Sequence, residues 1–137
     1  MTMSEQELRA APESEYMSAN QLAFFSFLIK TQLAEAEARH RQNVLDNTEH
    51  EHEADPIDRA SQEEVHQAAL LARGRDVKLI KQLQDALARI KRENYGYCED
   101  TGEPIGLGRL LAQPAARLSV EAQHRRELLG RQYQLAA

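Results

Sequence analysis

Residues 65–90 read VHQAALLARGRDVKLIKQLQDALARI, and the spacing of their apolar side chains decides the fold. Steps of four and three residues alternate along the stretch, through Val65, Ala69, Ala72, Asp76, Leu79, Leu83, Ala86 and Ile90. This heptad repeat predicts one face of a coiled-coil helix. Asp76 is its one polar member, and Gly74 lowers helix stability by about 1 kcal/mol relative to alanine. We expect a long helix over 56–94 that is loosest near Gly74.

A second amphipathic stretch precedes this helix. It begins after Ser18, whose hydroxyl suits an N-cap, and its apolar residues are spaced mostly by three or four: Leu22, Phe25, Ile29, Leu33, Ala36 and Val44. The connection to the next helix is short, and Asp55 and Pro56 suit the N-cap and first turn of the returning helix. The two helices are therefore predicted to form a long antiparallel coiled-coil hairpin over 18–94, with its tip at 53–60.

The remaining segments predict a small globular base. Residues 1–17 have no sustained period and form an N-terminal arm that packs on the base, with one helical turn near Ser4–Arg9. Glycines and a proline follow Asn94, which predicts a compact, turn-rich knot, and a C-terminal helix follows over 119–134. The fold class is thus mostly α, with the turn-rich knot and the C-terminal helix making a small globular base over 95–137.

Composition narrows the class of protein. The chain has 137 residues, a formal net charge of −5 and a sequence pI of about 5.5, so it lacks the basic surface of a direct DNA-binding protein. Its one cysteine cannot form an internal disulfide. The longest apolar stretch, around 22–29, is far shorter than the roughly 20 residues that cross a bilayer, and no signal-peptide pattern opens the chain. We expect a cytoplasmic monomer with no membrane span.

Acidic residues mark the predicted tip, in the run Asp55-Pro56-Ile57-Asp58-Arg59-Ala60. They have an ordinary explanation, because an N-cap and a favourable interaction with the helix dipole together stabilise a helix by about 0.5–2 kcal/mol. Ile57 is nevertheless unusual at a projecting, solvated tip unless a partner receives it.

The knot carries an incomplete metal-binding pattern. Cys98-x2-Thr101, then 17 residues, then Ser119-x2-Ala122 has the spacing of a zinc ribbon, which surrounds a tetrahedral ion with four thiolates. Only Cys98 keeps its sulfur, and hydroxyl or methyl groups do not replace thiolates. We expect no zinc or other metal, and a buried, unreactive Cys98. Apolar packing would then hold the knot, through Tyr95, Tyr97, Ile105, Leu107, Leu110, Leu111 and Leu118.

Several short runs match one known family over residues 15–126. They are Glu15-Tyr16-Met17, Gln21-Leu22, Asp55 through Ala60 with Gln62-Glu63-Glu64, Lys78-Leu79-Ile80-Lys81, Tyr95-Gly96-Tyr97-Cys98-Glu99, Glu103-Pro104-Ile105-Gly106 and Arg109-Leu110. Together they resemble the DksA family of RNA polymerase secondary-channel regulators. The resemblance implies a hairpin inserted into that channel, with Asp55, Asp58 and Ala60 near the catalytic centre. It also implies control of ribosomal RNA and other stringent-response promoters in concert with the alarmone ppGpp, without direct DNA contact.

Two departures from this family matter. The family's zinc cysteines match Cys98, Thr101, Ser119 and Ala122, so the chain resembles a zinc-independent paralogue. Basic residues that the family uses around ppGpp match Gln82, Gln113 and Gln123. Glutamine brings no charge to a polyphosphate, so we expect weaker synergy with ppGpp.

Other classes of function remain open at this point. A coiled-coil adaptor that only bridges proteins would have the same hairpin and would tolerate neutralisation of Asp55 and Asp58. A transcript-cleavage factor uses acidic tips to hold a metal, but only two acids lie here. No credible nucleophile and base are paired, which disfavours an enzyme. The basic residues Arg73, Arg75, Lys78 and Lys81 are explained by a solvated helix face.

Overall fold

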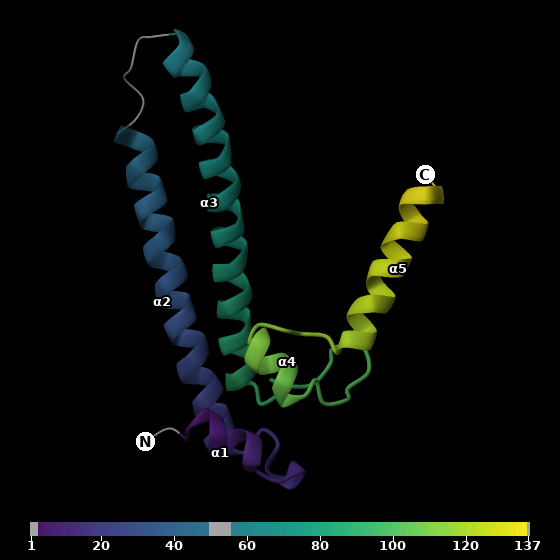
Figure 1. The fold of residues 1–137 in the computed structure, drawn as a ribbon. Helices are drawn as coiled ribbons and strands as arrows, with labels where there is room; N and C mark the ends of the chain where they lie inside the picture. Colours follow the sequence, from purple (N-terminus) through teal and green to yellow (C-terminus); the bar gives the residue numbers. More distant parts are fainter. Residues whose placement is uncertain (1–2, 50–55, 137) are drawn as a thin grey trace. The chain divides into compact units, whose positions relative to one another are not determined.

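The computed structural model describes the backbone of residues 3–49 and 56–136, and the side chains of these residues except 47–49, 56–59 and 136. The elements follow one another as α1 (Glu5–Ala10), the 3-10 turn η1 (Glu13–Glu15), α2 (Ala19–Glu49), α3 (Pro56–Lys91), α4 (Leu107–Ala112) and α5 (Val120–Ala136) (Figure 1). These described residues contain no strand, only an isolated bridge between Tyr97 and Pro104. The mostly α fold class is confirmed.

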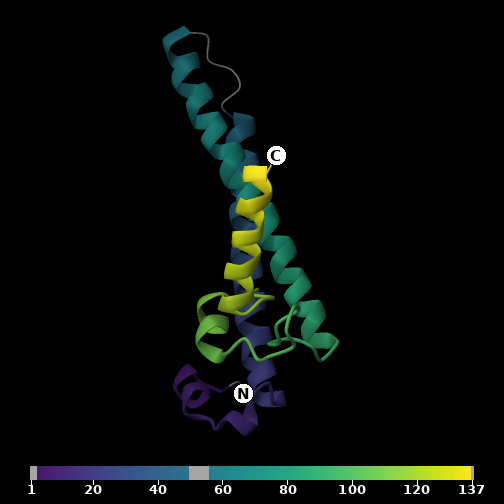
Figure 2. The same cartoon turned by 90° about the vertical axis from the view of Figure 1, so that its right-hand side faces the viewer.

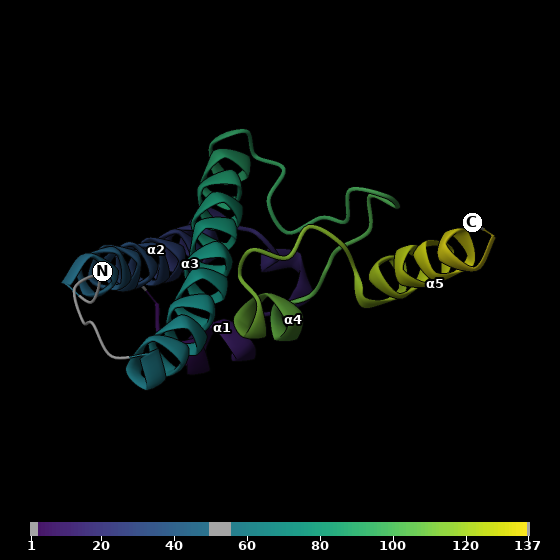
Figure 3. The same ribbon diagram turned by 90° about the horizontal axis from the view of Figure 1, so that it is seen from above.

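The two long helices, α2 and α3, pack against each other as a hairpin and can be followed through the turned views in Figures 2 and 3. Ser18 caps α2 as predicted, because its Oγ accepts a hydrogen bond from the backbone N–H of Gln21 at 3.4 Å. No helix among the described residues is long and apolar enough to cross a membrane.

The chain divides into two compact units, and the boundaries between them fall within the two long helices. One unit is Lys30–Gln84, the middle and far part of the hairpin. Ala36 and Leu83 are fully buried there, and Asp76 contacts Arg39 at 3.5 Å and Asn43 at 3.5 Å. Val65 does not follow its predicted core role, since 65% of it is exposed. The heptad pattern identifies the face of the helix but not how closely the partner helix approaches it.

The other unit comprises Met1–Ile29 and Asp85–Ala137. Its core contains Phe25, whose ring centroid lies 5.7 Å from that of Tyr95. The other members with under a tenth of their surface exposed are Leu8, Ile29, Ala86, Cys98, Ile105, Leu110, Ala116, Leu118 and Ala122. Apolar packing of the knot is thus present for Tyr95, Ile105, Leu110 and Leu118, whereas Tyr97 is 38% exposed. α4 was not predicted, because its six residues are too short to show a period.

The N-terminal arm is bound to the knot by specific contacts. α1 begins with a capping box, in which Ser4 and Glu7 exchange hydrogen bonds. The Tyr16 hydroxyl donates to the Gly96 carbonyl at 2.6 Å and accepts from the Gly106 N–H at 3.0 Å. Gly96 has φ of 90°, where an L side chain is strained, and an added Cβ would also displace the sulfur of Met17, 2.6 Å away, so glycine is favoured here. The division into arm, hairpin and base at residues 17 and 94 remains a prediction.

Candidate functional site

The predicted tip lies largely beyond what the structure describes. Asp55 falls outside the described residues. Asp58 belongs to the first turn of α3, which begins at Pro56, and its side chain is not described. Ala60 is described and exposed. The regulatory role of these three residues remains a prediction.

Backbone hydrogen bonds hold together the turn over residues 98–103, here called the knuckle. The Cys98 N–H donates to the Glu103 carbonyl at 2.8 Å, and the Gly102 N–H donates to the Cys98 carbonyl at 2.9 Å. Cys98 is buried, as predicted. Burial alone would raise the pKa of the thiol. Hydrogen bonds from the Thr101 hydroxyl and from the backbone N–H groups of Ser119, Thr101 and Asp100 outweigh it and lower the pKa to about 6.

The four positions of the metal pattern come together in the described knot but do not fit zinc. Thr101 Oγ1 accepts from the Glu103 N–H at 3.3 Å, and Ser119 Oγ accepts from the Ala122 N–H at 3.2 Å, where it caps α5. Ala122 is fully buried and offers only a methyl group. One thiol, one hydroxyl bonded within a turn and one hydroxyl that caps α5 cannot supply the four soft ligands of a structural zinc site. Among the described residues no group of three or more His, Cys, Asp or Glu side chains is placed to hold a metal.

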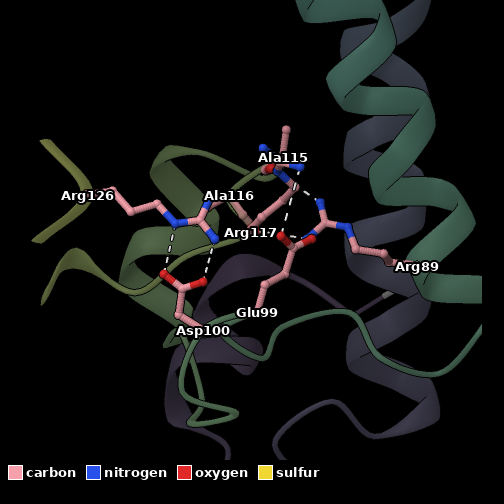
Figure 4. A network of polar contacts seen from close by, with 7 residues as sticks. All are labelled: Arg89, Glu99, Asp100, Ala115, Ala116, Arg117 and Arg126. Atoms are coloured by element: carbon pink, nitrogen blue, oxygen red, sulfur yellow. Dashed lines mark hydrogen bonds and ion pairs between the residues drawn. The ribbon is translucent and has the colours of Figure 1, made fainter. Parts of the chain in front are cut away.

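Charged residues connect the knuckle to the later segment of the metal pattern, over residues 117–126 (Figure 4). Arg126 of α5 forms a two-pronged ion pair with Asp100, with its Nε 2.8 Å from Oδ2 and its Nη2 bonded to Oδ1. The Glu99 N–H donates to the Arg117 carbonyl at 3.0 Å, and the side chains of the same two residues form an ion pair at 3.9 Å. The segments that a zinc ion would join are therefore joined by protein groups.

Polar residues that sequence analysis missed support the base from within. Arg89 is only 8% exposed and donates to the carbonyls of Ala116 and Ala115, both at 3.3 Å (Figure 4). Its guanidinium lies 5.9 Å from the centre of the Tyr95 ring, whose hydroxyl donates to the Pro114 carbonyl at 2.6 Å. Burial lowers the pKa of Arg89 and raises that of Tyr95. The helical period of α3 gave no signal for Arg89, because it lies beside the predicted seam rather than on it.

Two family models match consecutive parts of the chain. Residues 21–90 match the N-terminal domain of the DnaK suppressor protein DksA, and residues 93–128 match the prokaryotic dksA/traR C4-type zinc finger. The chain belongs to the DksA family. The second match includes all four positions of the metal pattern, and only one of them, Cys98, is a cysteine in this chain.

Similar DksA proteins span nearly the same length. The RNA polymerase-binding transcription factor DksA of Caulobacter vibrioides is 41% identical over 122 residues, which are 88% of this chain and 86% of that protein. The protein of the same name from Escherichia coli K12 is 36% identical over 127 residues, 88% of this chain and 81% of its own. The solved structure of transcription factor DksA2 from Pseudomonas aeruginosa is 41% identical, superposes with a TM-score of 0.83, and covers 93% of this chain and 99% of that one.

Proposed function

We propose that this chain is a bacterial, cytoplasmic transcription regulator that binds RNA polymerase directly. The observation that carries the proposal is the match along most of the chain to relatives named RNA polymerase-binding transcription factor. The hairpin would enter the secondary channel and bring Asp55, Asp58 and Ala60 near the catalytic centre. There the two carboxylates would alter the stability of promoter complexes at ribosomal RNA and stringent-response promoters. The chain itself performs no catalysis in this proposal.

The proposal includes function without zinc. It is supported by the occupied roles of Thr101 and Ser119 and by the methyl group of Ala122 at the fourth position. The ion pair between Asp100 and Arg126 would connect the knuckle to α5 in place of a metal.

The test is transcription from a ribosomal RNA promoter with purified polymerase and a zinc chelator. Wild type is compared with the Asp55→Asn/Asp58→Asn double variant, and polymerase binding is measured for both. We expect wild type to inhibit, and the variant to bind similarly without inhibiting. Equal inhibition by both proteins would refute the role of the tip. Binding without inhibition by either would favour the adaptor function, and inhibition that returns only with zinc would refute zinc independence.

A further inference from the structure

A group of polar residues interrupts the apolar seam of the hairpin within the unit Lys30–Gln84. Asp76 occupies a core position of the heptad pattern, and its side chain is only 13% exposed. Its carboxylate accepts a hydrogen bond from Asn43 Nδ2 at 3.5 Å and pairs with Arg39 Nε at 3.5 Å. His40 Nδ1 is buried and has no hydrogen-bond partner among the described residues. The four residues Arg39, His40, Asn43 and Asp76 are here called the polar layer.

The contacts of the polar layer hold α2 and α3 together only weakly. Both contacts of Asp76 are long for a hydrogen bond or ion pair, and the Arg39 side chain is 54% exposed, so water competes for its guanidinium. The buried nitrogen of His40 disfavours the closed hairpin, because water satisfies such a group once the helices separate. Polar residues at a core position also weaken a coiled coil relative to apolar residues. The helices therefore separate more easily at this layer than at an apolar position.

The packing of the hairpin differs on the two sides of the polar layer. Ala36 and Leu83, on the side nearer the start of α2 and the end of α3, are fully buried. On the other side the structure describes the side chains of residues 44–46 and 60–75, and none of these is buried. Leu71, for example, is 70% exposed. Since burial of apolar surface is the main force that stabilises packed helices, the far side of the layer is the less stable one.

Gly74 weakens α3 next to the polar layer. It lies two residues before Asp76, and a Cβ at this position would meet no atom within 4 Å. Packing therefore does not require a glycine here, while its helix propensity is lower than that of alanine. A weak helical position and a weak interhelical contact thus coincide within three residues of α3.

We propose that the polar layer is a built-in opening point of the hairpin. The residues beyond it, 44–49 and 56–75, are here called the distal arm, and residues 30–42 and 77–84 are called the stem. The two strands of the distal arm separate from each other locally while the stem stays packed. This device lets the distal arm change its conformation without unfolding the rest of the chain.

The first test is amide hydrogen exchange of the full wild-type chain, followed by mass spectrometry and corrected for intrinsic rates. We expect amides of the distal arm to exchange at least tenfold faster than those of the stem, with an abrupt change in rate at the polar layer. Ordinary fraying would instead give rates that increase gradually from the stem to the far ends of α2 and α3. A gradual profile without a step at Asn43 and Asp76 would overturn the proposal.

The second test replaces the polar contact by an apolar one in the variant Asn43→Leu/Asp76→Leu. Both partners of the hydrogen bond are removed together, and Arg39 is left in contact with water, so no charge becomes buried and unpaired. We expect exchange of the distal arm to slow by at least tenfold, so that the step disappears, and the thermal midpoint of unfolding to rise. Unchanged exchange of the distal arm in this variant would also overturn the proposal.

The matched control is Arg41→Leu/Gln67→Leu. Like the test variant, it replaces one charged side chain and one amide by leucine, but at exposed positions of the same two helices. The control should keep the step in exchange rate at the polar layer. Equal slowing of the distal arm in both variants would show that added leucines, rather than the loss of the polar layer, are responsible, and would overturn the proposal. If either variant does not fold, the wild-type profile decides between a step and a gradual change.

Discussion

At the scale of single residues, Cys98 is the one cysteine among the four positions of the metal pattern, and its sulfur accepts several hydrogen bonds. Because these hydrogen bonds favour the thiolate and lower the pKa to about 6, the ultraviolet absorbance of the thiolate should appear with a midpoint near that pH. The signal is unambiguous, since the chain has one cysteine and Cys98→Ser should abolish it. A midpoint near the ordinary thiol value of about 9 would contradict the prediction.

The same pKa shift predicts how stability depends on pH. The folded state releases the Cys98 proton at a lower pH than the unfolded state does, so the stabilisation is complete above the unfolded pKa and is lost as pH falls through about 6. The free energy of unfolding should therefore rise with pH between about 6 and 9, as measured by urea denaturation. Cys98→Ser serves as the control and should show a flatter dependence over this interval.

Asp100 and Arg126 form an ion pair that connects the knuckle to α5. Asp100→Asn or Arg126→Gln should each lower the free energy of unfolding, and the charge swap Asp100→Arg/Arg126→Asp should recover part of the loss. Exposed ion pairs contribute little on average, but this one has two-pronged geometry and joins segments 26 residues apart. Glu5→Gln is the control, because it removes only a local pair with Arg9 in α1.

The pair also has a pH signature. Hydrogen bonding from Arg126 lowers the pKa of Asp100, so its contribution is present above the ordinary aspartate pKa and is lost as pH falls through the lower folded value. The stability difference between wild type and Asp100→Asn should narrow in acid, below about pH 4. A difference that does not change with pH would point to loss of packing rather than of charge.

At the scale of elements, the N-terminal arm is held against the knot by Tyr16. Tyr16→Phe removes one hydroxyl that serves both Gly96 and Gly106, and it leaves two backbone groups without this partner. We expect the free energy of unfolding to fall by about 1–3 kcal/mol, together with faster hydrogen exchange at the Gly106 amide. Tyr133→Phe is the matched control, because Tyr133 is 79% exposed in α5. Equal effects of the two changes would show that the contact contributes nothing specific.

The long helices show how far an element can be predicted from its period. Heptad spacing identified α3 and its inward side, and the N-cap at Ser18 identified the start of α2. The same pattern failed at Val65, which is largely exposed, and at Gln21, which is 1% exposed although the neighbouring Leu22 was expected to face inward. Gln21 is buried because its Oε1 accepts from the Met17 N–H at 3.0 Å as the chain turns into α2. A period does not register such a contact.

At the scale of the whole molecule, the missing cationic residues predict weak cooperation with ppGpp. Gln82, Gln113 and Gln123 stand where the resemblance places basic residues, and an amide cannot neutralise a polyphosphate. The variant Gln82→Lys/Gln113→Lys/Gln123→Lys should increase the ppGpp-dependent part of promoter inhibition, measured by transcription in vitro. Inhibition without ppGpp should stay at the wild-type level. Strong synergy already in wild type would refute the prediction.

The sequence alone determined the helical fold class, the membership of the DksA family and the shortage of zinc ligands. Each of these depends on periodicity, on short motifs or on the chemistry of single residues, and all three can be read directly from the sequence. The tertiary structure decided what stands in the place of the missing ligands, which polar groups are buried, and which apolar residues of α3 stay exposed. Those features depend on contacts between distant residues, such as Tyr16 with Gly106, 90 positions apart, and Arg89 with Ala116, 27 positions apart. The local sequence pattern does not predict such pairs, because they form only when the packed core brings their backbones together.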